Sequence, residues 1–159
     1  ATVTQTVNQW IVAEAANAIG DVTGMLEAFR FNDAAATAYH FVWDYFCDWY
    51  LEFAKPLFAS SDEAAKAETR ATAAWVRDQI LKILHPFMPY ITEELWARTS
   101  DVPRGEMLIL SEWPARGASR VAADAILVLQ RAFAREIRIG HEQRGAHRSH
   151  REIAQQTKQ

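Results

Sequence analysis

The chain has 159 residues, of which 50% are apolar and 23% are charged, and this composition excludes an intrinsically disordered protein. Its formal net charge of −3 is unusual for a general nucleic-acid binder, because such proteins carry a basic surplus that offsets phosphate charge. The single cysteine, Cys47, excludes an internal disulfide, and no run approaches the roughly twenty apolar residues of a membrane span. We therefore expect a soluble protein of the reducing cytoplasm.

Two long helices are predicted in the first part of the chain. The first covers about residues 4–28. The second begins at Asn32, a residue type favoured as an N-cap, which is followed by Asp33 in the first turn. It is predicted to end before Pro56, because the residue before a proline is disfavoured in the helical conformation. Apolar residues at spacings of three and four predict its buried stripe: Tyr39, Val42, Phe46, Trp49 and Phe53.

A third long helix and a short helix follow. Ser60 and Glu63 have the spacing of a capping box, which predicts that the third helix starts there and runs to about Phe87. Two prolines interrupt the chain next, and a short amphipathic helix is predicted from about Thr92.

The fold is predicted to be all-α, an up-and-down bundle of four long helices plus the short helix. Residues 100–118 contain glycines and prolines around an apolar run, which predicts a loop with one extended segment at residues 107–110. The last long helix is expected over residues 119–139. The bundle would thus span residues 1–139, and residues 140–159 would form a polar, basic tail that is partly flexible or the start of a truncated C-terminal helix. Since the sequence starts at Ala1 without a methionine, an excised fragment is one interpretation.

An acidic stripe on the second helix is the first candidate for chemistry. Asp44, Asp48 and Glu52 follow one another at spacings of four, so they share one helix face. A metal-binding bundle would add a Glu-x-x-His element, which the sequence lacks. We interpret the stripe as a solvated face that repels phosphates.

Histidines and a nucleotide-binding look-alike are the other candidates. His85 stands at a helix end, where we expect it to bond terminal carbonyls. Residues 138–141 (RIGH) differ by one residue from an ATP-binding signature of class I synthetases, but that signature requires a strand-to-helix junction, and no sheet is predicted here. His141, His147 and His150 lie in the tail without a second ligand-rich segment. We expect no catalytic, metal or cofactor site.

The turn Phe29-Arg30-Phe31-Asn32 is the candidate for RNA contact. Aromatic rings and a guanidinium stack on unpaired bases, and an amide reads base edges. A purely structural alternative stays open, in which Phe31 forms a hydrophobic staple and Asn32 caps the helix. Trp10 has the same two interpretations, a core residue or a stacking surface.

Three segments resemble valyl-tRNA synthetases in the same order: FRFNDAA (residues 29–35), FVWDYFCDWYLE (residues 41–52) and HPFMPYITEELW (residues 85–96). The last is similar in leucyl and isoleucyl enzymes, and FCDWY (residues 46–50) distinguishes valine. The likeness extends over residues 8–114 and fades through the last predicted helix. It implies the anticodon-binding bundle of a valine-tRNA ligase.

The resemblance implies a parent enzyme that is cytoplasmic, uses ATP to join valine to its tRNA, and edits mischarged threonine in another domain. This chain would hold neither the catalytic nor the editing part, and it would be inactive alone. Its expected partners are the anticodon stem-loop of tRNA(Val) and the remainder of the synthetase, and we expect a monomer. Two alternatives stay open: a bundle that braces the synthetase without reading bases, and the equivalent domain of an isoleucyl or leucyl enzyme.

The predicted RNA-contacting residues combine the turn with scattered polar and cationic side chains. Family members commonly carry a cation where this chain has Gln9, which weakens any phosphate contact there. The predicted contacts are Gln9, Trp10, Arg30, Phe31, Asn32, Arg77 and Arg98.

Overall fold

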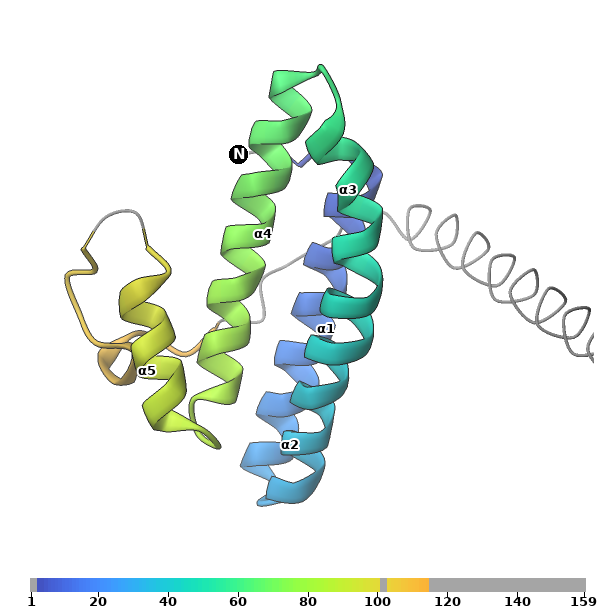
Figure 1. The fold of residues 1–159 in the computed structure, drawn as a ribbon. Helices are drawn as coiled ribbons and strands as arrows, with labels where there is room; N and C mark the ends of the chain where they lie inside the picture. The colour runs from blue at the N-terminus through green and yellow to red at the C-terminus, as the bar shows by residue number, and fades with distance from the viewer. Residues whose placement is uncertain (1–2, 101–102, 115–159) are drawn as a thin grey trace, which may run out of the picture. The chain divides into compact units, whose positions relative to one another are not determined.

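The computed structural model describes residues 3–100 and 103–114, all of which lie in one compact unit formed by residues 1–121. The described residues are helical, without a strand, as Figure 1 shows. The elements are α1 (Thr6–Glu27), α2 (Phe31–His40), η1 (Phe41–Tyr50), α3 (Leu51–Ala59), α4 (Glu63–Leu84), α5 (Pro89–Arg98) and the short η2 (Leu108–Leu110). The all-α prediction is confirmed. The predicted last long helix and the tail lie outside the described residues.

Three long rods run up and down, and a shorter helix packs beside them (Figure 1). The first rod is α1. The second consists of α2, η1 and α3, which follow one another without a break in helical backbone conformation. The third is α4, which contacts α1 and α3, and α5 packs against α4. Short turns connect the rods, as expected for an up-and-down arrangement.

The second rod does not end before Pro56, and this prediction was wrong. Helix α3 continues through the proline to Ala59. A proline inside a helix removes one backbone hydrogen bond and costs about 3 kcal/mol. Here the next residues add only one further turn, and the preceding Ala54 is completely buried. Packing therefore fixes the helix where local preference would have stopped it.

The centre of the second rod is wound as a π-helix. The Leu51 N–H donates to the Phe46 carbonyl, five residues back, so each turn holds more residues than an α-turn. Phe41, Tyr50 and Ala54 are buried, whereas Tyr39 of the predicted stripe, which lies in α2, is 58% exposed. The other four residues of the predicted stripe are half-buried, so the prediction was wrong only for Tyr39.

Both predicted N-caps were also wrong. Asp62, not Ser60, caps α4: its Oδ1 accepts hydrogen bonds from the N–H groups of Ala64 (2.9 Å) and Ala65 (3.1 Å). Ser60 accepts a bond from the Asp62 N–H instead. Asn32 lies within the first turn of α2, which starts at Phe31 and has no side-chain cap. Asp62 and Ser60 are near enough in sequence to compete for the N-cap position of α4, and the turn geometry decides between them.

A buried hydrogen-bond network joins the three rods. The Tyr50 hydroxyl donates to Asn8 Oδ1 (3.1 Å), and Asn8 Nδ2 donates to Thr69 Oγ1 (3.1 Å). Thr69 in turn donates to the Ala65 carbonyl (2.7 Å). Asn8, Tyr50 and Thr69 are each 0% exposed. Because unpaired buried polar groups are costly, these bonds fix the relative position of α1, η1 and α4.

Glu68 of α4 caps the start of α1 from across the bundle. Its carboxylate accepts bonds from the backbone N–H groups of Thr4 (3.1 Å) and Gln5 (2.8 Å) and from Asn8 Nδ2 (3.0 Å). Gln5 itself, at the N-cap position, makes no side-chain cap bond. Partial burial raises the pKa of Glu68, but these hydrogen bonds, with one from the Thr4 hydroxyl, outweigh burial and lower it to about 2.

An arginine clamp holds α5 and the following segment on α4. The Arg104 guanidinium lies 3.5 Å from the centre of the Trp96 ring and donates to Asp78 Oδ1 (2.8 Å) and to the Trp96 carbonyl (2.9 Å). Beneath it, Trp96, Leu81 and Leu108 form a small buried cluster. The segment expected to be extended at residues 107–110 is instead the 3-10 turn η2. Glu93 Oε1 fixes this turn by accepting a bond from the Leu108 N–H (2.7 Å).

Tyr50→Phe tests the buried network. The substitution keeps the ring but leaves Asn8 Oδ1 without its donor, so the free energy of unfolding should fall by about 1–3 kcal/mol in urea denaturation. Tyr39→Phe removes an exposed hydroxyl and should change stability by less than about 0.5 kcal/mol. Equal effects of the two substitutions would show that the network contributes nothing specific.

Glu68→Gln tests the cross-bundle cap through its pH dependence. A carboxyl whose folded pKa is depressed adds stability above its unfolded pKa, near 4.3 in model peptides, and loses it as the pH falls through the folded value. The wild-type chain should therefore lose stability between about pH 4.5 and pH 2 more steeply than Glu68→Gln. Urea midpoints at several pH values measure this, with Glu27→Gln at an exposed site as control. Parallel curves for Glu68→Gln and the wild type would contradict the assignment.

Candidate nucleic-acid interface

The predicted RNA contacts do not form one site. Gln9 lies in the first turns of α1, whereas Arg30, Phe31 and Asn32 lie beyond its other end. At 1.5 Å per residue, the two positions are about 30 Å apart along the helix. Arg77 lies on α4 and Arg98 at the end of α5. The structure therefore offers three separate surfaces: the start of α1, the α1–α2 turn, and the flank of α4 and α5.

The start of α1 contributes an amide but no stacking surface. Gln9 Nε2 donates to the Val3 carbonyl (2.9 Å). Trp10 is only 4% exposed, with its ring 6.3 Å from each of the Tyr45 and Phe53 rings, and its Nε1 donates to Glu14 (3.1 Å). A base cannot reach the indole faces in this arrangement. Trp10 is thus a residue of the core, as the structural interpretation of it expected.

The α1–α2 turn exposes two aromatic rings in a strained conformation. Helix α1 ends in a Schellman motif: the Arg30 N–H donates to the Met25 carbonyl (2.8 Å) and the Phe29 N–H to the Leu26 carbonyl (3.0 Å). This motif places Phe29 in the left-handed region, with φ of 58°, where glycine is usual. Phe29 is 79% exposed and packs edge-on against Phe31, which is 55% exposed. The turn therefore exposes both rings, although the left-handed conformation of Phe29 costs conformational free energy.

Nearly every described cation already has an acceptor. The pairs are Arg30 with Asp33, Lys55 with Glu52, Lys66 with Glu63, Arg98 with Glu94, and both Arg77 and Arg104 with Asp78. Lys82 donates to the Glu112 carbonyl (2.8 Å). Among the lysines and arginines of residues 3–100 and 103–114, only Arg70 makes no side-chain hydrogen bond or ion pair, and its side chain is exposed.

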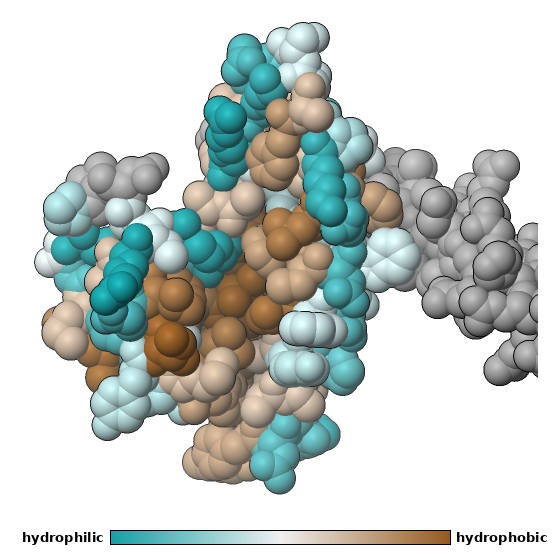
Figure 2. Space-filling view, viewed as in Figure 1, coloured by the Kyte–Doolittle hydropathy of each residue, from teal (hydrophilic) through white to brown (hydrophobic). Residues whose placement is uncertain are grey.

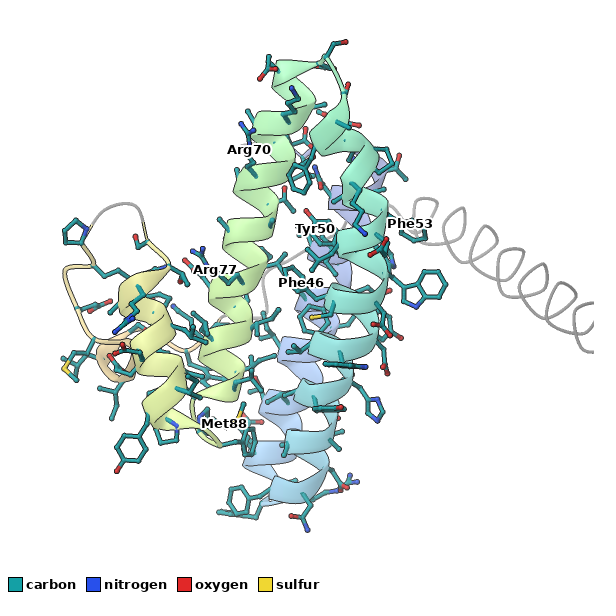
Figure 3. The ribbon with its side chains drawn as sticks, viewed as in Figure 1. Phe46, Tyr50, Phe53, Arg70, Arg77 and Met88 are labelled. Carbon is teal, nitrogen blue, oxygen red and sulfur yellow. The ribbon has the colours of Figure 1, made fainter. Side chains whose placement is uncertain are left out.

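Arg70 is not among the RNA contacts predicted from the sequence. Its spacing of seven from Arg77 places both on the same side of α4, as Figure 3 shows, and this spacing was the available signal. Asp78 carries one negative charge between Arg77 and Arg104, so this trio keeps a net charge of +1. The flank of α4 is thus locally positive in a protein whose net charge is negative.

The described residues show no arrangement suited to metal binding. No group of three or more metal-ligating side chains occurs among them. The acidic stripe is half-exposed or exposed, and Asp44 pairs with His40. His85 does not bond helix-terminal carbonyls as predicted; its Nδ1 lies 2.8 Å from Thr92 Oγ1, because the turn before α5 brings that buried hydroxyl to it. None of the described helices is long and apolar enough to cross a membrane.

Comparisons with known proteins agree on one family. Residues 8–157 match the model of the anticodon-binding domain of tRNA ligase. The chain is 57% identical over 113 residues to the valine–tRNA ligase of Rhodopseudomonas palustris, covering 71% of this chain and 12% of the relative. It is 53% identical over 126 residues to that of Caulobacter vibrioides, covering 78% and 14%. The chain thus spans only about an eighth of the length of such relatives.

Phe29→Gly tests whether the turn is strained. Glycine adopts the left-handed conformation freely, so the substitution should raise the free energy of unfolding by roughly 0.5–1 kcal/mol, or leave it unchanged if ring contacts offset the strain. Urea denaturation measures it, with Phe58→Gly inside α3 as a control that should destabilise by about 1 kcal/mol or more. A clear loss of stability in Phe29→Gly would contradict the strain.

Proposed function

The chain belongs to the family of anticodon-binding domains of tRNA ligases, and we propose that it binds the anticodon stem-loop of a valine tRNA within a valine–tRNA ligase. The observation that carries the proposal is the identity of more than half of the matched residues with valine–tRNA ligases. The parent enzyme would act in the cytoplasm and use ATP to attach valine. This chain would contribute RNA binding and no catalytic group.

We place the phosphate contacts on the flank of α4. A carboxylate partner neutralises a cation and occupies some of its donors, whereas Arg70 has no such partner and keeps its full charge and all its donors for a phosphate. Arg77 is two turns further along the same side, in a trio with net positive charge. Gln9, near the start of the neighbouring α1, would supply a neutral donor or acceptor to the RNA once released from Val3.

The α1–α2 turn is less suited to phosphates. Arg30 is paired with Asp33 (2.6 Å), and Asp21 and Glu27 lie close in sequence, so the local charge is negative. Phe31 and Asn32 are exposed and keep base stacking and edge reading chemically possible there. We therefore treat the turn as the second candidate surface for RNA, and Arg98, paired with Glu94, as peripheral.

A salt-dependent titration tests the proposal. The whole 159-residue chain is titrated with a fluorescent hairpin carrying the valine anticodon loop, and with hairpins carrying a scrambled loop and an isoleucine loop. Tighter binding of the valine loop supports base reading by this domain. Equal and negligible binding of all three would favour a bundle that only braces the synthetase, and preference for the isoleucine loop would overturn the valine assignment.

Arg70→Gln locates the phosphate contact. The variant should weaken binding to every hairpin alike and reduce the slope of log affinity against log salt by about one, as expected for one lost phosphate contact. Lys55→Gln removes the same charge from a paired lysine and should leave the slope unchanged. If both variants behave alike, net charge and not the α4 flank governs binding, and the placement fails.

A further inference from the structure

One end of the described unit gathers exposed apolar side chains from two turns. Figure 1 shows that the α1–α2 turn and the α4–α5 turn lie at the same end of the rods, and Figure 3 places Met88 at that end. The exposed fractions are 79% for Phe29, 55% for Phe31, 44% for Met88, 92% for Tyr90 and 51% for Ile91. We call these five residues the apolar end. Exposed apolar side chains gathered at one end of a small unit favour an interaction site there.

The apolar surface continues beside α5. An open cavity of about 900 Å³ lies between α5 and the segment around η2, and Tyr90, Met107, Ile109 and Leu110 line it. The last three are 56%, 64% and 70% exposed. Figure 2 shows apolar surface at the lower end of the unit and around α5. The cavity therefore extends the apolar end with further exposed apolar side chains.

The charge of this end favours a protein partner over RNA. Carboxylates flank both turns: Asp33 and Glu27 beside Phe29 and Phe31, and Glu93 and Glu94 after Tyr90. Of these, Glu93 and Glu94 stand in the first half of α5, and Glu93 accepts the backbone bonds that hold η2. Against them stand Arg30 and Arg98, which pair with Asp33 and Glu94, and the cavity lining adds both Arg104 and Glu106, so carboxylates remain in excess. A phosphate backbone would be repelled here, whereas an apolar protein surface with basic residues at its rim would fit.

The strain at Phe29 points the same way. A left-handed phenylalanine that is 79% exposed contributes little to the isolated unit, although it occupies a position where glycine costs less. Strained residues mark functional positions, because some interaction offsets their cost. Burying an aromatic ring between proteins supplies such an interaction.

We infer that the apolar end docks onto another part of the same tRNA-ligase polypeptide, through an apolar surface with a basic rim. The inference rests on the proposed function only in taking the chain as one domain of such a ligase. Its length supports this occupant: the matched relatives are about eight times longer than the segment they share with this chain, so most of the polypeptide lies outside it. RNA would then bind the α4 flank while the apolar end is covered by protein.

Hydroxyl-radical footprinting of two proteins tests the inference. The first is the 159-residue chain, and the second is the intact valine–tRNA ligase of Rhodopseudomonas palustris, without tRNA. Oxidation rates are compared at Phe29, Phe31, Met88 and Tyr90 and at the aligned positions of the relative. We expect rates on the order of tenfold lower in the intact enzyme, as for side chains in the core of an interface. Phe58, at the other end of the rods, is the control and should be oxidised at similar rates in both.

Equal rates at the apolar end in the two proteins would overturn the inference. Protection that arises only when tRNA is added would also overturn it and would assign this end to RNA. Neither outcome depends on whether the isolated chain binds the valine hairpin, so failure here and failure of the proposed function are distinguishable.

Discussion

The hydrogen bonds among Asn8, Tyr50 and Thr69 are the constraint on which the rest of the unit depends. They lie where three rods meet, and each polar atom involved is removed from water. Satisfying them requires one register of α1 against η1 and α4. The π-helical winding of η1 is compatible with this register, since Phe41 and Tyr50 at its two ends are both buried and Tyr50 reaches Asn8 of α1. Glu68, next to Thr69, extends the same network to the first backbone amides of α1.

This register also arranges the outer surfaces. With the rods fixed, Arg70 and Arg77 share one side of α4, and the two turns with exposed rings share one end. The two surfaces then differ in their charge. The α4 flank keeps a free cation and a net-positive trio, whereas the apolar end has carboxylates around paired Arg30. An RNA hairpin and a protein surface can thus be held at different places on one small bundle.

Local sequence rules predicted the helices and their up-and-down order, because apolar periodicity reports directly on helix formation. They failed where distant residues decide. Pro56 continues a helix that packing holds, and Asp62 caps α4 in preference to Ser60. The π-helical winding of η1 accompanies hydrogen bonds from Tyr50 to α1 and α4, and no local sequence pattern predicts these distant partners. Likewise Trp10 is buried by Tyr45 and Phe53, and the freedom of Arg70 is evident only after the other cations have been paired in space.

The central claim is that the α4 flank, and not the apolar end, meets the RNA. Mapping of backbone amide chemical shifts in the 159-residue chain on addition of the valine anticodon hairpin tests it most directly. The account predicts that the largest changes cluster on α4 between Lys66 and Arg77 and near Gln9. Changes centred on residues 29–32 and 88–91, with α4 unaffected, would contradict it.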